Sequence, residues 1–340
     1  MVEHTALKYP DFIDTPFEGW KLDSGKVREL SRLSPARSAF HVALEWIIIF
    51  AAIFVSHRIS NPLAYIAAII LIGSRQHALL LLMHEAAHRR LFNSKRLNDW
   101  ICEVLVTWPV LVSLRAFRHT HLQHHRHLNL PTDGDLRKKL EDPDWHFPLP
   151  RRRLLWSLAK QFTGLGIWYV LKIFRYGNAD AEASGQTRRY RLARVAYYIS
   201  VLAVIVYFRV LTLFLVYWIV PLLTCLIAFN RMRVLSEHPP IERASVYGVI
   251  CTYRLSLIER ILFAPKNCHY HIEHHSYPSV PFFNLGKLHR ELKTNSEYRA
   301  ALRPVSYWEL LKSLSTSRGQ PINTADATLG RAGDSASIIG

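Results

Sequence analysis

The sequence has few of the residues from which soluble redox sites are usually built. Its four cysteines, Cys102, Cys225, Cys251 and Cys268, are scattered along 340 residues without C-x-x-C spacing, which excludes a zinc knuckle and an iron–sulfur framework. No glycine-rich dinucleotide fingerprint follows an expected strand, and the sequence has no solenoid-type repeat. Any redox chemistry in this chain must therefore draw its electrons from another protein.

Acidic residues are also scarce, with 26 Asp and Glu against 43 Lys and Arg, so the net charge is +17. The basic residues lie beside apolar stretches rather than in a separate basic domain, so we expect anionic lipid headgroups as their partner and no nucleic acid. The segment 150–174 begins with three arginines and carries Trp156 and Trp168. This mixture is typical of a helix that lies in a membrane interface.

Half of the residues are hydrophobic, and four runs concentrate them: 39–55, 62–83, 195–208 and 210–229. A membrane-spanning helix needs about 20 mostly apolar residues. The second and fourth runs have this length, and a short polar link joins each of them to a shorter run. The pattern predicts an all-α integral membrane protein with four transmembrane helices in two hairpins, and a soluble helical core is the alternative. The short apolar stretch 101–114 contains Pro109, so we place it in the interface or as a re-entrant segment.

Three histidine clusters lie next to these runs. They are His84-Glu-Ala-Ala-His88, His121-Leu-Gln-His124-His125 and His271-Ile-Glu-His274-His275. Imidazole is a common ligand for zinc, copper and iron. On a helix, residues three and four apart share a face, whereas adjacent residues diverge by about 100°. Eight histidines are too many for one ion, so the spacing predicts two metals side by side.

Charge and parity together predict the sidedness of the three histidine clusters. An even number of crossings separates them, so they face the same side of the membrane. Basic residues flank the clusters, whereas the links within the hairpins hold only Arg58 and Arg209. Because Lys and Arg accumulate in cytoplasmic loops, we expect the site and both termini to be cytosolic.

This topology divides the chain into three parts. We expect a cytosolic N-terminal segment over 1–38, a membrane domain over 39–295 and a cytosolic C-terminal segment over 296–340. The first 35 residues do not have the pattern of a signal peptide. From about residue 315 the composition is rich in Ser, Thr, Gly, Ala and Asp, which predicts disorder.

The order of the motifs resembles that of the membrane fatty acid desaturases and hydroxylases. The flanking residues agree, with Arg75-Gln76-His77 before the first cluster, Arg118-His119 before the second and Tyr277-Pro278-Ser279-Val280-Pro281 after the third. The resemblance covers residues 40–295. It implies a four-helix membrane stem and a cytosolic helical cap. In this family the cap holds a histidine-rich di-iron centre, two iron ions that use dioxygen to attack an unactivated C–H bond.

The resemblance also implies further site residues. His238, between the fourth crossing and the third cluster, is expected as a ninth ligand, and Asn267 is expected to meet a metal through water. Side chains that hydrogen-bond the ligands or balance the charge of the metals are expected at His77, His119, His127, His269, Glu85, Glu237 and Glu273.

The function that we expect is O2-dependent introduction of a double bond into an acyl or alkyl chain. Electrons would come from a separate NAD(P)H reductase with ferredoxin or cytochrome b5 as carrier. Hydroxylation of a lipid or small amphiphile at the same type of site is the alternative. The three-residue gap in the first cluster is narrower than in acyl-CoA desaturases, which counts against that class.

Two other classes explain less of the sequence. His84-Glu85-x-x-His88 also fits the zinc metalloprotease motif, but a protease would leave the six histidines of the other clusters without a role. Glu85 and His88 form one Glu-x-x-His pair, whereas soluble di-iron bundles need two such pairs and further carboxylates. A membrane binding or transport protein with structural histidines would contain no stoichiometric iron.

Overall fold

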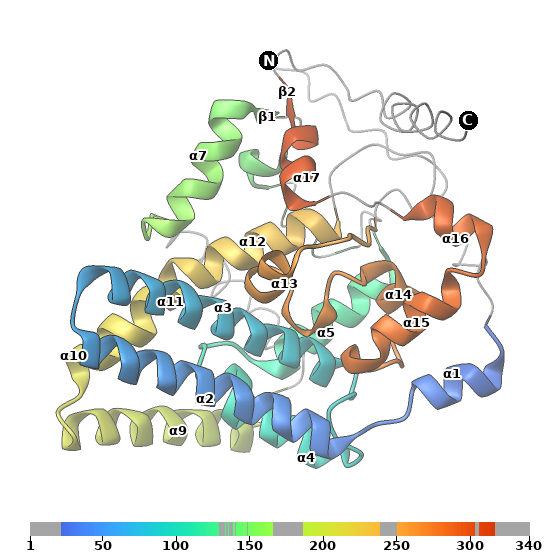
Figure 1. Cartoon of the computed structure of the whole chain (residues 1–340). Coiled ribbons are helices and arrows are strands. Elements are labelled where there is room, and N and C mark those ends of the chain that lie inside the picture. Colours follow the sequence, from blue (N-terminus) through green and yellow to red (C-terminus); the bar gives the residue numbers. More distant parts are fainter. Residues whose placement is uncertain are drawn as a thin grey trace, which may run out of the picture.

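The structure is a computed structural model, and its first two long helices form an apolar pair (Figure 1). It describes residues 22–128, 133, 135, 139, 141–147, 149–165, 186–238, 250–302 and 306–316. After α1 (Ser24–Leu30), α2 (Pro35–Ile59) and α3 (Pro62–Ala87) lie side by side, and each begins with a proline in its first turn, where no N–H is needed. Ser60 turns the chain with φ 53°, and the Asn61 side chain accepts a 2.8 Å hydrogen bond from the Ala64 N–H.

A second apolar pair follows later in the chain. It consists of α9 (Arg188–Tyr207) and a bent helix made of α10 (Leu211–Phe214), the π-helix η3 (Leu215–Ile219), α11 (Val220–Leu223) and α12 (Cys225–Glu237). The bend lies near Pro221, which lacks an N–H and clashes with the carbonyl four residues earlier. The chain widens to a π-helix before this proline and kinks after it at Thr224, with φ −123° and ψ −86°.

Among the described residues, four helices are long and apolar enough to cross a membrane. They are Pro35–Ile59, Pro62–Ala87, Arg188–Tyr207 and Leu211–Glu237, with mean hydropathies of 2.1, 1.8, 1.3 and 2.3. The expectation of four helices apolar enough to span a membrane is therefore confirmed among the described residues. The helices extend beyond the apolar runs because polar residues continue them, as the arginines from Arg188 onward do at the start of α9. Large apolar side chains such as Phe54 on α2 and Ile199 on α9 are exposed, as lipid-facing residues are. The arrangement of these helices in a bilayer stays a prediction.

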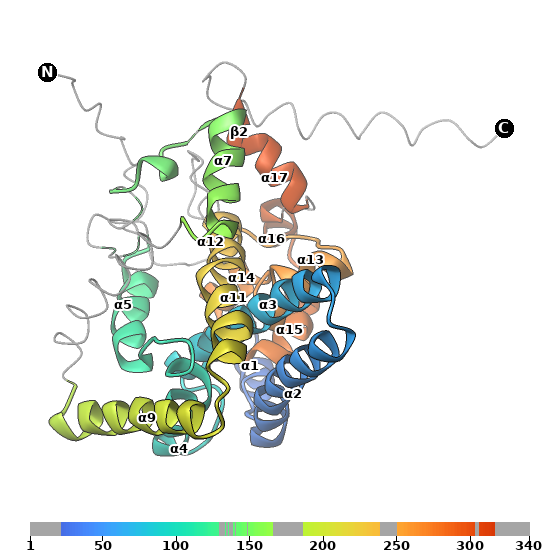
Figure 2. The ribbon, with the colours of Figure 1, turned by 90° about the vertical axis from the view of Figure 1, so that its left-hand side faces the viewer.

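Shorter elements gather at one end of the long helices. These are α4 (Lys95–Cys102), η1 (Glu103–Thr107), α5 (Leu114–Arg126), η2 (Pro143–Trp145), α7 (Arg151–Phe162), α13 (Leu257–Leu262), η5 (Pro265–Asn267), α14 (His271–Ser276), η6 (Phe282–Asn284), α15 (Leu285–Leu292), α16 (Ser296–Ala301) and α17 (Tyr307–Leu314). Two short strands, β1 (Leu149–Pro150) and β2 (Ser315–Thr316), pair in parallel. Figures 1 and 2 both place α7 and α17 on the side of the molecule opposite α9 and α4.

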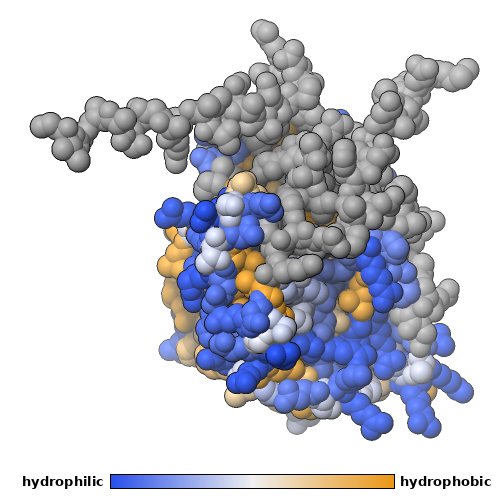
Figure 3. Space-filling view, turned by 90° about the vertical axis from the view of Figure 1, so that its right-hand side faces the viewer, coloured by the Kyte–Doolittle hydropathy of each residue, from blue (hydrophilic) through white to orange (hydrophobic). Residues whose placement is uncertain are grey.

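The helix α3 connects the apolar part to this end. Its first half exposes Leu63, Ile66 and Ile70, whereas from Ile72 to Ala87 only Leu80 is more than slightly exposed. The buried half belongs to the main hydrophobic core, together with parts of α2, α4, α5, α14 and α15. Among the described residues, hydrophilic ones predominate on the face that carries α15 and α16 (Figure 3).

Two expectations fall partly outside the described residues, and a third can be compared with the structure. The helix α7 covers the first half of the expected interfacial segment and exposes Trp156, but residues 166–174 lie outside the description. Residues 317–340, expected to be disordered, also lie outside it. The stretch 101–114 is the end of α4, the π-helix η1 and a turn at Leu111, with Trp108 buried.

Candidate metal centre

Four helical segments bring the nine histidines together. His84 lies in the last turn of α3 and His88 directly follows that helix. The second cluster lies on α5, whose first turn the Ser113 side chain caps, and the third cluster forms α14 itself. His238 ends α12, where the helix stops. The C-terminal ends of α3 and α12 and the helices α5 and α14 therefore define the site.

The nine side chains divide into two groups. Five have ligand atoms that all lie within 4.8 Å of one another: His84, His88, His121, His125 and His274. His124, His238 and His275 form the second group within the same limit, and His271 joins them with its Nε2 2.8 Å from that of His238. The rings of His125 and His275 stack between the groups with their centroids 4.1 Å apart.

The split follows from helical spacing. In both H-x-x-H-H clusters the histidines four residues apart stay in one group, as His121 and His125 do, while the middle histidine joins the other group. Adjacent histidines therefore serve different groups, as their divergence by about 100° around a helix predicts.

The distances between ring nitrogens fit ligands around metal ions. The Nε2 atoms are 2.8 Å apart in His88–His121 and His271–His238, and 3.1 Å apart in His125–His121, His274–His125, His124–His238 and His275–His271. With a metal–nitrogen bond of about 2.1 Å, two ligands at a right angle lie about 3.0 Å apart. A neutral imidazole has a single N–H, so rings that meet this often cannot all pair with one another. In addition, the buried Nε2 of His84 has no hydrogen-bond partner among the described residues. The donor set therefore fits two metal ions.

Burial favours the neutral form of five of the site's imidazoles outside the spanning helices. It holds the pKa values of His121, His271, His274 and His275 well below the ordinary range, with neighbouring charges adding to the effect. For His88, burial followed by the nearby Arg90 and Arg118 lowers the pKa to about 4. A metal ligand must be deprotonated, so these side chains are ready to bind near neutral pH.

Acidic side chains contact three of the histidines from behind. The Asp133 carboxylate lies 2.8 Å from Nδ1 of His124. Glu237 lies 3.7 Å from Nδ1 of His271, and Glu85 lies 3.6 Å from Nδ1 of His84. A carboxylate at Nδ1 orients the ring and leaves Nε2 free for a metal. Asp133 carries no sequence signal for this role, because it follows His124 by nine residues and belongs to no motif.

Glu273 has different neighbours from those expected. Its carboxylate accepts hydrogen bonds from Thr252 Oγ1 at 2.6 Å, from His289 Nδ1 at 2.5 Å and from the Tyr298 hydroxyl. All of these groups lie on the side of α14 away from the other clusters, so Glu273 fixes α14 against α15 and α16. His289 and Tyr298 carry no sequence signal for this role.

Other expected residues lie near the site without a contact to the nine histidines in the described structure. The Asn267 amide donates to the Phe282 carbonyl at 3.1 Å and accepts from Arg260 at 3.3 Å. His119 meets Gln123 at 3.3 Å on the outer side of α5. His77 and His269 are buried, and His127 directly follows α5. The roles expected for these five residues stay predictions.

Arg118 joins the first two clusters. Its guanidinium donates to the carbonyls of Ala86 at 2.8 Å and Ala87 at 3.0 Å, at the end of α3, and forms two hydrogen bonds to Asp99. A planar fork that serves four acceptors fixes α5 relative to α3. The sequence marked Arg118 only as a residue beside the second cluster.

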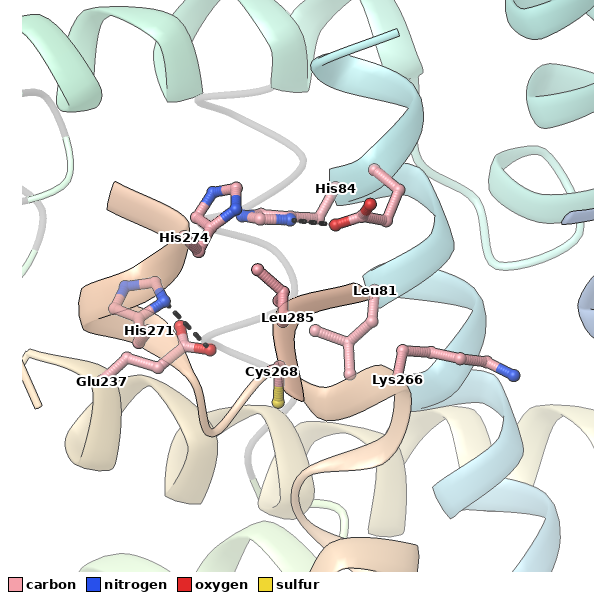
Figure 4. A pocket seen from close by; sticks show the side chains of 9 residues that line it. Leu81, His84, Glu237, Lys266, Cys268, His271, His274 and Leu285 are labelled. Carbon is pink, nitrogen blue, oxygen red and sulfur yellow. Dashed lines mark ion pairs between the residues drawn. The ribbon is translucent and has the colours of Figure 1, made fainter. Parts of the chain in front are cut away.

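A pocket opens between the two histidine groups (Figure 4). His84 and His274 line it from the first group and His271 from the second, while Leu81 and Leu285 form an apolar wall. Glu85, Glu237 and Cys268 also line it, and Lys266 contributes its alkyl stem. The space between these side chains is small, so as it stands it has room for about one water molecule.

Comparisons with known proteins agree with this site. The chain is 26% identical over 293 residues to a dihydrorhizobitoxine desaturase of Bradyrhizobium elkanii, which covers 79% of this chain and 82% of the relative. It is 29% identical over 224 residues to the sphingolipid delta(4)-desaturase/C4-monooxygenase DES2 of Homo sapiens, 63% of this chain and 61% of the relative. The matches thus span about three fifths of the length of the human protein. The sequence model named fatty acid desaturase matches residues 60–307, a range that contains all nine histidines. The chain is therefore an oxidoreductase of the desaturase and hydroxylase type and belongs to the fatty acid desaturase family.

Proposed function

We propose that this protein is an O2-dependent desaturase that introduces a double bond into an acyl or alkyl chain at a di-iron centre held by its nine histidines. The observation that carries the proposal is the division of these histidines into groups of five and four with the nitrogen spacing of metal ligands. Two bound irons would supply activation of dioxygen for attack on an unactivated C–H bond.

The protein's own residues orient the histidine rings and shield the site from water. Asp133 fixes the ring of His124 through a hydrogen bond and supplies negative charge, which a shell of neutral imidazoles lacks. Glu237 lies beside His271 and is itself held by Arg233. Leu81 and Leu285 place apolar groups beside His84, His271 and His274 and would limit the access of water to them.

The balance of the reaction requires an outside reductant. Loss of two hydrogens from the substrate, with one O2, two electrons and two protons, gives an alkene and two waters. The sequence contains no flavin, nicotinamide, haem or iron–sulfur motif, so the two electrons come from a separate donor. We propose ferredoxin or cytochrome b5, reduced by an NAD(P)H reductase.

The substrate that we propose is a lipid or smaller amphiphile that reaches the site from the membrane. Positive charge beside the clusters supports a cytosolic site and cytosolic termini. Hydroxylation is the second candidate, because the human relative is named a C4-monooxygenase as well as a desaturase.

Iron content tests the metal centre. Purified protein should approach two irons per chain, and His124→Ala should lose iron and activity together. His57→Ala is the matched control, because His57 is exposed on α2 away from the site, and it should keep both. One tightly held zinc instead of iron would refute the proposal in favour of a protease.

Labelled dioxygen tests the reaction. In membranes supplied with NAD(P)H and air, the product mass should fall by two hydrogens for a desaturase. A hydroxylase would instead add one oxygen that comes from the labelled gas. Activity that persists without oxygen would exclude both reactions.

A further inference from the structure

Three charged side chains are buried where α2 and α3 cross the apolar part of the molecule. Glu45 on α2 is 1% exposed and Arg75 on α3 is 7% exposed. Arg75 Nη1 lies 3.3 Å from one Glu45 oxygen, and Lys266 Nζ of η5 lies 2.5 Å from the other. Charged residues inside a membrane are costly and need partners there. We call Glu45, Arg75 and Lys266 the buried charge cluster.

The charge cluster binds the backbone of the segment that carries α13. Arg75 Nη2 donates to the Ile261 carbonyl at 2.5 Å, and Ser74 Oγ donates to the same carbonyl at 2.9 Å. The last carbonyls of a helix have no partner within the helix, so Ser74 and Arg75 satisfy groups that α13 leaves open. At the other end, the Ser256 and Glu259 side chains form a capping box. Backbone can lie at membrane depth when its polar groups are satisfied in this way.

The exposed face of α13 is mainly aliphatic and also carries Arg260, whose guanidinium donates a hydrogen bond to Asn267. Leu257 is 70% exposed, Ile258 69% and Ile261 43%, although the helix has only six residues. The inner side packs through Leu262 and Phe263 against a small core formed by Ile69, Cys225 and Phe229 of the spanning helices. The exposed aliphatic face is therefore continuous with the lipid-facing surface of α3.

The depth of α13 follows from helix geometry. Ser74 comes 12 residues after Pro62, the first residue of α3. At 1.5 Å per residue, this places Ser74 about 18 Å from the loop end of α3, within a hydrocarbon layer of about 30 Å. On α2, Phe40 lies five residues beyond Glu45 toward the cap and is still 60% exposed. The charge cluster and α13 thus lie inside the layer that α2 and α3 cross.

We propose that α13 is a lipid-facing helix that re-enters the leaflet on the cap side, and that the buried charge cluster anchors it there. Its occupant is the acyl-chain region of the bilayer, which the exposed face of α3 already contacts. The inference rests on α2 and α3 crossing the membrane, not on the iron centre or its reaction.

Collision accessibility of a spin label tests the depth of α13. A nitroxide is attached to Ile258→Cys in a variant without the four native cysteines, reconstituted in vesicles of phosphatidylcholine and phosphatidylglycerol. Matched labels at Ile66→Cys and Glu297→Cys serve as the lipid-facing and aqueous controls. The label at residue 258 should collide with oxygen as often as the label at residue 66. Its collisions with a water-soluble nickel chelate should be severalfold fewer than those at residue 297. Nickel collisions equal to those at residue 297 would overturn the proposal.

Two further measurements keep the proposal testable. If the cysteine-free variant does not fold, the fluorescence that Ile258→Trp adds to that of the nine native tryptophans should be quenched by lipids brominated along their acyl chains. No quenching beyond that of the native protein would overturn the proposal. Adding Glu45→Gln should raise nickel collisions at residue 258, because the anchor loses its central charge. Unchanged nickel collisions would refute the anchoring role. Neither measurement depends on iron or turnover, so its failure is distinct from failure of the proposed function.

Discussion

At the scale of single residues, some of the histidines that we propose as metal ligands depend on groups on the other side of the ring or on the helix that carries them. Asp133 does this for His124, and Arg118 fixes the end of α3 on which His84 lies. The histidines themselves could be predicted, because their spacing on a helix is a local property of the sequence. Asp133 and Glu273's partners could not, since only the folded chain brings them to their positions.

Replacing Asp133 should weaken iron binding more than it weakens the fold. In Asp133→Asn the amide can still accept a hydrogen bond from His124, but the negative charge that makes the ring a stronger ligand is lost. Loss of such a partner costs about 10–100-fold in metal affinity. Competition with a chelator measures this affinity. Asp135→Asn is the control and should bind iron as the native protein does, because only the backbone N–H of Asp135 meets Asp133. Equal affinities in both variants would contradict the role of Asp133.

The ion pair of Asp99 and Arg118 should make stability depend on acid pH. Burial alone would raise the pKa of Asp99, but hydrogen bonds from Arg118 and Asn98 outweigh it and hold the pKa below the ordinary 3.8. The stabilisation is therefore present above the unfolded pKa and is lost as the pH falls through the lower folded pKa.

Thermal unfolding in detergent measures this dependence. Because Asp99 is partly exposed, Asp99→Asn should cost about 1 kcal/mol at neutral pH. The difference from the native protein should persist at about pH 5 and shrink below about pH 4. A difference that grows as the pH falls would contradict the sign of the pKa shift.

At the scale of elements, the helices were predictable in number but not in their ends or bends. The apolar runs mark α2, α3, α9 and the helix from Leu211 to Glu237, because lipid-facing helices need length and apolar composition. Their ends lie beyond the runs, where arginines and histidines continue a helix that packing supports. The π-helix before Pro221 and the burial of α3 from Ile72 onward depend on neighbouring helices, which a single segment does not reveal.

Gly73 should be required for close packing of α3 against the start of α12. A Cβ added at Gly73 would lie 2.3 Å from Cys225 Cβ and 3.1 Å from the Leu226 nitrogen, so the backbones must move apart. Overpacking of this kind costs about 1–3 kcal/mol. Gly73→Ala should therefore lower the melting temperature. Gly286→Ala is the matched control, because its Cβ would meet Tyr270 at an ordinary 3.6 Å. Equal melting temperatures for the two variants would refute the close approach.

At the scale of the whole molecule, the chain combines an apolar stem with a polar end that holds the histidines. The two connections α2–α3 and α9–α10 lie at the same end of the long helices, opposite the end where α14 and α15 lie (Figure 1). The histidine groups lie where α3 and α12 leave the apolar part, so the lipid substrate that we propose would reach them from the bilayer. This arrangement follows from the order of spans and clusters in the sequence. The contacts that Arg118 and the buried charge cluster make between elements do not follow from that order.

Labelling from the two sides of the membrane should separate these ends. In a variant without native cysteines, Ser60→Cys and Glu297→Cys are placed at exposed positions, one in the α2–α3 turn and one on α16. In sealed vesicles of known orientation, a membrane-impermeant maleimide should label residue 297 from the cytosolic side and residue 60 from the other side. The physical reason is that basic residues flank the histidine clusters, while the two turns within the helix pairs carry only Arg58 and Arg209. Arg209→Cys, in the second turn, should label as Ser60→Cys does. Labelling of residues 60 and 297 from one side would show that α2 and α3 do not cross the bilayer as a pair, whatever metal the histidines bind.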